Sequence, residues 1–138
     1  MDSSNLNHYK QIDTCYWETL HPLIFYKKTH IVDQIIPSKI KYIDDFKTWL
    51  PVITVLIVPA GTKVSLVILK KKIQICRAEQ AFVKEQFLNH HIDHNIDQSL
   101  SFFDDSFIYK TNTLVKVKNL ENKSGIYMYC NMIDAKCH

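Results

Sequence analysis

The chain has 138 residues, of which 46% are hydrophobic and 22% are charged. This length suits one domain, and this balance is typical of a folded globular protein and excludes an intrinsically disordered one. The formal net charge is only +3, whereas nucleic-acid binders concentrate a stronger positive charge on one face. We therefore expect a single domain over residues 1–138, with 1–20 as a peripheral N-terminal segment, and nucleic acid is not indicated as a partner.

The chain carries no sequence signal for a membrane or for export. Its longest apolar run, Val52–Val58, is strand-sized, whereas a spanning helix needs about 20 apolar residues. The first residues lack the basic start and apolar run of a signal peptide. We therefore expect no membrane partner and a cytosolic or particle-enclosed protein, where thiols stay reduced. The four cysteines are expected to be free: Cys15, Cys76, Cys130 and Cys137.

Three elements are predicted before residue 51. Apolar residues between His8 and Leu20 recur at steps of three and four, which indicates a short amphipathic helix. Leu23 to Lys27 follows a proline and is aromatic and β-branched, as strands are. Ser38 to Leu50 keeps helical spacing, with Ser38 as a possible N-cap and Pro51 as the stop.

The middle of the chain predicts a β-hairpin. Val52–Val58 and Val64–Leu69 are separated by Pro59-Ala60-Gly61-Thr62, in which Pro presets φ and Gly tolerates a positive φ. Ile73 to Cys76 alternates as a further strand. Ala78 to Leu88 has helical spacing and is expected to be a helix, although its Ala81-Phe82-Val83 segment equally suits an extension of the sheet.

The last third predicts a loop, strands and a helix. Asn89 to Ser101 is polar and aperiodic, as exposed loops are. Residues 107–117 suggest a second hairpin, and a strand follows Gly125. A final short helix starts at Asn131 or Asp134 and runs to His138. The expected fold is thus α+β: a small, mostly antiparallel sheet with two or three helices packed on it.

Potential chemical groups are few. His90 and His94 would share one face of a helix and are the weak candidates for a metal, zinc being the ion that such ligands suit; otherwise no cofactor is expected. Cys76 alternates onto an apolar face, where a thiol has a raised pKa and is inert. Lys70-Lys71-Lys72 is the one basic run, expected as a solvated turn or a phosphate-touching edge.

One longer pattern is more specific: Ile57–Lys63, then Cys76–Val83, then Ser124–Tyr129, with Ala135 beyond. Over residues 52–135 it resembles an uncharacterised domain of giant DNA virus and phage proteins, often found beside pentapeptide repeats. The resemblance implies a structural motif of nine residues, with Tyr127 where the family usually has histidine. The motif comprises Pro59, Gly61, Thr62, Cys76, Arg77, Ala78, Ala81, Gly125 and Tyr127.

The resemblance implies a viral origin, in the host cytoplasm or the virion, but no activity. With no convergent catalytic set, we expect a non-enzymatic viral accessory or virion-associated protein. It would act through contacts with a viral or host protein, or with a second copy of itself. The expected interface residues are Tyr16, Trp17, Phe102 and Phe103, because exposed aromatics anchor interfaces.

Two alternatives remain open. Gly125-Ile126-Tyr127 with Ala135 distantly resembles a segment of ADP-ribosyltransferases, which would make the protein a small transferase using Arg77, Tyr127 or a carboxylate. Lysines near Lys70–Lys72 would alternatively support weak nucleic-acid binding, which falls steeply with added salt.

Overall fold

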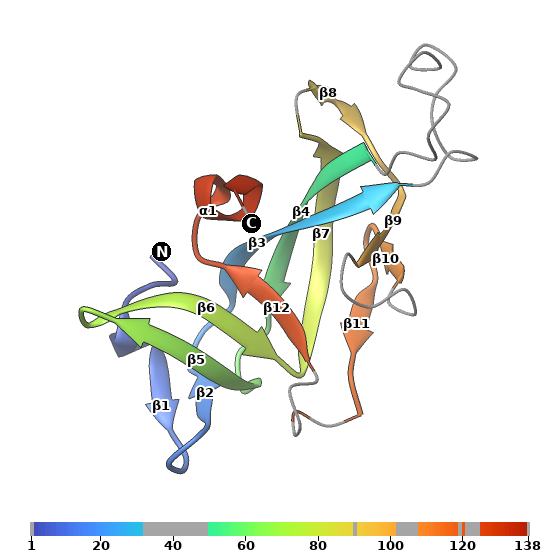
Figure 1. The fold of residues 1–138 in the computed structure, drawn as a ribbon. Helices are drawn as coiled ribbons and strands as arrows, with labels where there is room; N and C mark the ends of the chain where they lie inside the picture. The colour runs from blue at the N-terminus through green and yellow to red at the C-terminus, as the bar shows by residue number, and fades with distance from the viewer. Residues whose placement is uncertain are drawn as a thin grey trace.

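The computed structural model describes residues 2–31, 50–89, 91–101, 108–118, 120 and 125–137, with the backbone alone for residues 50 and 91–94. Strands dominate this part of the chain (Figure 1). In chain order the elements are η1 (Leu6–His8, a 3-10 helix), β1 (Tyr9–Gln11), β2 (Trp17–Thr19), β3 (Leu23–Ile31), β4 (Leu50–Val58), β5 (Lys63–Leu69), β6 (Lys72–Ala78), β7 (Gln80–Leu88), β8 (His91–Asn95), β9 (Gln98–Ser101), β10 (Ile108–Lys110), β11 (Leu114–Lys116), β12 (Ile126–Tyr129) and α1 (Met132–Cys137).

The strands form one antiparallel sheet in the order β1-β2-β5-β6-β12-β3-β4-β7-β11. β9 also pairs with β3, β10 pairs with β9, and β8 pairs with β7. Within the described residues the one α-helix is only six residues long. The expectation of an α+β fold with two or three helices is therefore wrong, and the fold is mostly β. None of the helices in the described ranges is long and apolar enough to cross a membrane.

The sheet curls around its largest apolar core. Cys76 of β6 and Met128 of β12 belong to the same buried cluster as Leu56 of β4, Val83 of β7 and Val115 of β11. Figure 1 shows β12 crossing in front of the lower ends of β4 and β7, which agrees with this packing. The strands therefore have an inner face toward this core and an outer face, on which α1 lies.

β4 is the central strand of the fold. It pairs with β3 over nine residues and with β7 on its other edge. Its apolar run is buried on both sides, because Leu56 and Val58 face the inner core while Ile53 and Val55 pack outside with Met132 of α1. A continuous apolar strand of this kind belongs inside a sheet.

The predicted hairpin of β4 with β5 is wrong. Both edges of β4 are occupied, so the chain crosses after Val58 and β5 pairs with β6 and β2 instead. The hairpin in this region is β5–β6, closed by Lys70 and Lys71. The expectation that the basic run forms a turn is thus confirmed for these two residues.

The helix predicted over Ala78–Leu88 is wrong, because these residues form the end of β6 and all of β7. A β-bulge explains the misleading period. Val55 of β4 faces Glu85 and Leu56 faces Val83, so Lys84 is an extra residue. Both Lys84 and Glu85 are exposed, and this interruption of the two-residue alternation imitates helical spacing.

The amphipathic helix predicted between His8 and Leu20 is also wrong, since β1 and β2 form an antiparallel pair there. The side chain of Asp13 accepts hydrogen bonds from the backbone N–H groups of Cys15 and Tyr16, at 2.8 and 2.9 Å. An aspartate that bonds backbone groups two and three residues ahead favours a turn over a helix.

Two predictions in the last third are wrong. Asn89–Ser101 is not an exposed loop, because it contains β8 and β9 and buries Ile96 and Ser99. β10 and β11 do not form a hairpin with each other, since β10 pairs with β9 and β11 with β7. The turn between them carries Asn112 at φ 67°, and Asn112 N donates to Val83 O of β7.

The remaining elements agree with the sequence where the structure describes them. The strands predicted at Leu23–Lys27 and Ile73–Cys76, and the strand after Gly125, are confirmed as β3, β6 and β12. The C-terminal helix is confirmed as α1, with Asp134 N bonded to the side chain of Asn131 at 2.8 Å. The helix predicted over Ser38–Leu50 lies outside the described residues, apart from Leu50 at the start of β4.

The β5–β6 turn predicts a stabilising substitution. Leu69 pairs with Lys72, and Lys70 and Lys71 between them have φ angles of 53° and 66°. Two-residue turns with two positive φ angles strongly prefer Asn-Gly. The double variant Lys70→Asn/Lys71→Gly should therefore raise the free energy of unfolding by about 1 kcal/mol, measured by urea denaturation. An unchanged or lower value would show that the turn is unstrained.

Candidate functional site

The first part of the predicted motif, Pro59, Gly61 and Thr62, forms a tightly bonded turn. Thr19 Oγ1 and Thr62 Oγ1 each donate to Pro59 O at 2.6 Å, and Thr62 N donates to Thr19 Oγ1 at 3.0 Å. Gly61 has a φ of 79°, and its N–H donates to Thr19 O at 2.7 Å. Because every polar atom named here bonds within the protein, the turn joins β4, β5 and β2 and offers little to a ligand.

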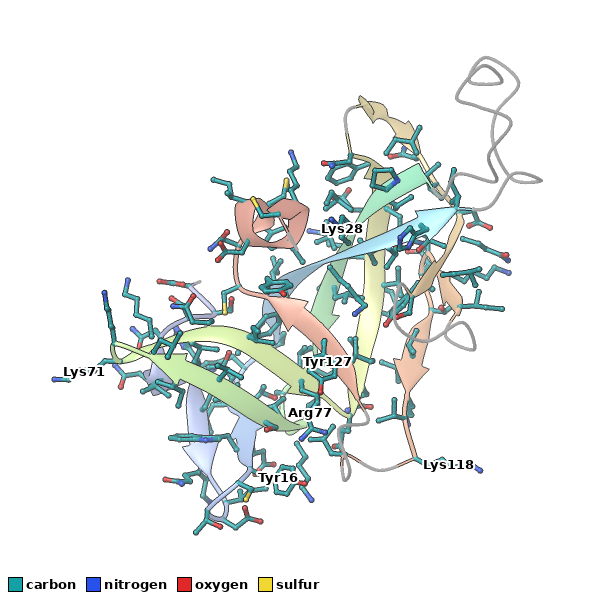
Figure 2. The ribbon with its side chains drawn as sticks, viewed as in Figure 1. Tyr16, Lys28, Lys71, Arg77, Lys118 and Tyr127 are labelled. Atoms are coloured by element: carbon teal, nitrogen blue, oxygen red, sulfur yellow. The ribbon has the colours of Figure 1, made fainter. Side chains whose placement is uncertain are left out.

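The second part of the motif surrounds Arg77. Its guanidinium donates to Leu120 O and lies 6.0 Å from the ring centroid of Tyr127. Arg77 and Tyr127 are direct cross-strand partners on β6 and β12, and Figure 2 shows them side by side. The arginine therefore joins these two strands to Leu120.

The small residues of the motif are buried. Cys76, Ala78 and Ala81 have no exposed surface and belong to the inner core. Burial raises the pKa of the Cys76 thiol well above its ordinary value, and burial likewise raises the pKa of Cys130 to about 11. Both thiols are therefore protonated at neutral pH and poor nucleophiles. All four cysteines are free, as predicted.

The predicted metal site is not described. His90, together with the side chain of His94, lies outside the described residues. Among the side chains that the structure does describe, no three His, Cys, Asp or Glu residues gather as a metal-binding group.

Two of the four predicted interface aromatics, Tyr16 and Trp17, lie within the described residues. Phe102 and Phe103 fall outside the described residues. Tyr16 is half-buried and carries the ammonium of Lys63 at 4.2 Å from its ring centroid. Trp17 is half-buried and packs against the inner core.

A buried polar network, which the sequence prediction missed, links five strands. Gln86 Oε1 accepts hydrogen bonds from Thr54 Oγ1, at 2.9 Å, and from Ser99 Oγ, while Gln86 Nε2 donates to Tyr109 O at 2.9 Å. Thr29 Oγ1 donates to Ser99 Oγ at 2.7 Å. All five residues are buried. Their bonds are satisfied internally, so the network stabilises the junction of β3, β4, β7, β9 and β10.

Lys27 is an unusual buried cation. Only 7% of its surface is exposed, and its Nζ donates to Tyr127 O at 2.8 Å. Burial lowers the pKa of this ammonium to about 8. Lys27 thus spans from β3 to β12 just beyond the single residue pair that joins these two strands, Tyr26 with Tyr129.

A small pocket of about 280 Å³ lies between the N-terminal residues, β6 and α1. Its two carboxylates already have partners: Asp2 accepts from the N–H and hydroxyl of Ser4, and Asp134 accepts from the side chain of Asn131. Neither Arg77 nor Tyr127 lines it. The pocket therefore presents no convergent set of reactive groups.

An apolar row lies on the outer face of the described sheet. Ile24 pairs with Ile57, Ile57 with Phe82, and Phe82 with Leu114, so four apolar side chains lie side by side across β3, β4, β7 and β11. Ile24 is 39% exposed and Leu114 is 44% exposed, and the two between them are half-buried. We call these four residues the outer row.

The outer row continues an apolar surface that α1 covers. On the same face of β4, Val55 precedes Ile57 by two residues and packs with Ile53, Phe87 and Met132 of α1. Among the described elements, α1 covers the part of this face formed by Ile53, Val55 and Phe87 and leaves the outer row exposed. Residues two apart on a strand share a face, so the covered and the exposed parts form one surface.

The described residues form a single β-sheet in which the predicted motif packs and bonds within the protein, and the outer face of this part of the chain carries exposed apolar side chains. The chain belongs to a family of unknown function (DUF5758), whose model matches residues 13–135. The predicted resemblance to an uncharacterised domain is confirmed to this extent, and the match begins well before residue 52. No curated protein and no solved structure matches the chain.

The glycine of the last motif strand predicts a sharp difference between two alanine variants. A Cβ at Gly125 would lie 2.8 Å from both Arg77 Cγ and Leu120 Cδ1, at a φ of 121°. A Cβ at Gly61 would meet only an atom at 3.7 Å, at a φ of 79°. Gly125→Ala should therefore cost about 2–4 kcal/mol of unfolding free energy and Gly61→Ala about 1 kcal/mol, measured by urea denaturation. Equal losses would contradict the close packing at Gly125.

Lys27 predicts a pH-dependent stability. Its folded pKa of about 8 lies below the ordinary 10.5, so the charged form of Lys27 destabilises the folded state. This cost is fully present below pH 8 and decreases as the pH rises toward 10.5. At pH 7, urea denaturation should give Lys27→Met a free energy of unfolding higher than that of the wild type by on the order of 1–3 kcal/mol. This difference should be smaller at pH 10. A constant difference across this range would show that the ammonium does not titrate as described.

Proposed function

We propose that this protein is a non-enzymatic accessory protein that works by binding another protein through its outer row. In line with the predicted resemblance, we place it in a virus, as an accessory or virion-associated protein acting in the host cytoplasm or the virion. The observation that carries the proposal is the in-register exposure of Ile24, Ile57, Phe82 and Leu114.

An uncovered antiparallel sheet normally presents polar side chains to water, alternating with the buried ones. The outer row breaks this rule at four neighbouring positions and spans roughly 14 Å across the strands. Clustered apolar residues on a protein surface mark interaction sites, whereas scattered ones are ordinary. The row is therefore more informative than the single exposed apolar residues elsewhere, such as Ile12 and Ile133.

The surroundings of the outer row favour a partner other than a second copy. Lys84 is exposed on β7, two residues after Phe82, and Lys116 is exposed on β11, two residues after Leu114. Glu85 is the exposed acid beside them. This end of the row carries more positive than negative charge, which suits a partner with acidic residues around an apolar centre.

The enzyme alternative draws less support from the site. Arg77 and Tyr127 lie on a strand surface, and the pocket of about 280 Å³ does not include them. Small-molecule sites are concave and place a few polar groups together. The residues on which a transferase reaction would depend are instead engaged in joining β6, β12 and the segment at Leu120.

The proposal predicts that one acidic substitution in the outer row abolishes partner binding. We expect tagged wild-type protein to retain a partner from cells in which the protein is naturally produced, and Leu114→Asp to lose it. A charge placed in a desolvated apolar contact should weaken binding about 100-fold or more. The measurement is affinity capture with mass spectrometry, followed by titration of the purified partner.

The matched control is Ile133→Asp on α1, where the replaced side chain is 73% exposed but lies outside the outer row. This variant should bind like the wild type. Equal unfolding midpoints of both variants would show that folding is unaffected. Equal retention of the partner by wild type and Leu114→Asp would refute the proposal.

A further inference from the structure

The β5–β6 hairpin ends in two lysines held in a costly backbone conformation. Lys70 and Lys71 form the whole loop, because Leu69 and Lys72 on either side are paired. Their φ angles of 53° and 66° lie in the left-handed region. That region is easy for glycine and asparagine but unfavourable for residues with a long side chain.

Strain of this kind is informative because it persists only where something else compensates for it. Natural sequences follow local preferences at most positions and depart from them chiefly at functional ones. This turn geometry favours Asn-Gly, but the sequence has Lys-Lys. The difference indicates that positive charge at this tip is useful to the protein.

Apolar side chains accompany the two lysines. Leu69 is 58% exposed and Val67 is 47% exposed, on the strand that leads into the loop. Figure 2 places Lys71 at the far end of the hairpin, away from the labelled Arg77, Tyr127 and Lys118. The tip thus combines charge and aliphatic surface at a point that protrudes from the sheet.

The three lysines of the basic run have different surroundings. Lys72 lines the pocket that also contains Asp2, and the charge of Lys72 acts on that carboxylate. Lys70 and Lys71 are both exposed at the loop itself. Their charges are therefore free to meet an external surface at the end of the hairpin.

We propose that the β5–β6 tip is a peripheral binding site for an anionic lipid surface, with Lys70 and Lys71 at the headgroups and Leu69 inserted among them. Lysines near an anionic membrane are attracted to it, and an adjacent apolar side chain adds burial at the interface. This contact is separate from the outer row, and it departs from the prediction that the protein has no membrane partner.

The side chains of the tip favour lipid over nucleic acid. Proteins that bind single strands without sequence preference place aromatic rings for base stacking beside their cations. Residues 67–72 contain no aromatic residue. An exposed leucine gains nothing from a phosphate backbone but gains burial at a lipid interface.

The test is co-sedimentation with phosphatidylcholine vesicles, with and without phosphatidylserine. The wild type should bind only the vesicles containing phosphatidylserine and should be released by added salt. Lys70→Asn/Lys71→Gly should weaken binding roughly 20-fold, although the same variant is expected to fold more stably. Leu69→Ser should weaken binding roughly tenfold.

Two controls match these changes in kind. Lys110→Asn/Lys118→Asn removes the same charge from exposed positions at the end of β10 and just beyond β11, and Ile133→Ser removes an exposed apolar residue from α1. Both should bind nearly as well as the wild type. Absence of binding to phosphatidylserine vesicles, equal losses in the two lysine pairs, or full binding by Leu69→Ser would each overturn the proposal.

A single-stranded oligonucleotide at equal phosphate concentration tests the other source of negative charge. The proposal expects little binding to it. Oligonucleotide binding that is lost with Lys70→Asn/Lys71→Gly but kept by Leu69→Ser would assign the tip to nucleic acid and overturn the lipid site.

Discussion

Burial of β4 on both faces is the constraint on which the rest of this fold depends. Its run from Val52 to Val58 is apolar apart from Thr54, so it requires a covering layer on each side and a neighbour on each edge. β3 and β7 supply the edges, the curled sheet supplies the inner layer, and α1 supplies part of the outer one. Because both edges are taken, the chain after Pro59 has to leave β4 and build a second group of strands.

The same constraint produces the surface to which we assign function. A strand that is apolar throughout must have its outer face covered, and α1 is too short to cover all of it. Val55 lies beneath the helix, whereas Ile57 and its neighbours Ile24, Phe82 and Leu114 do not. A helix of six residues rises only about 9 Å. The outer row is the part of this outer apolar face that α1 leaves exposed and that a bound partner can cover.

Residue types and their near neighbours in the sequence predicted the features that depend on them alone. The turn at Gly61, the strand after Gly125 and the burial of Cys76 all followed from residue type and neighbours. The outer row could not be predicted in this way, since it depends on which strands become neighbours. Gln86 was missed for a related reason: its hydrogen-bond partners include residues of three other strands, β4, β9 and β10, and the buried positions of β9 are serines, which carry no hydrophobic pattern.

The bulge in β7 has a consequence for how the length of this chain can change. Val83 and Gln86 both face inward, and the two exposed residues between them, Lys84 and Glu85, oppose the single residue Val55. Loss of either would leave a regular strand with every later side chain on its present face. Loss of Phe82 or Val83 with the bulge kept in place would instead move every later side chain to the opposite face of the sheet. The Gln86 amide would then lie on the outer face, beneath α1. A single-residue deletion in this strand should therefore be tolerated best at Lys84 or Glu85, because loss of either keeps the later side chains on their present faces.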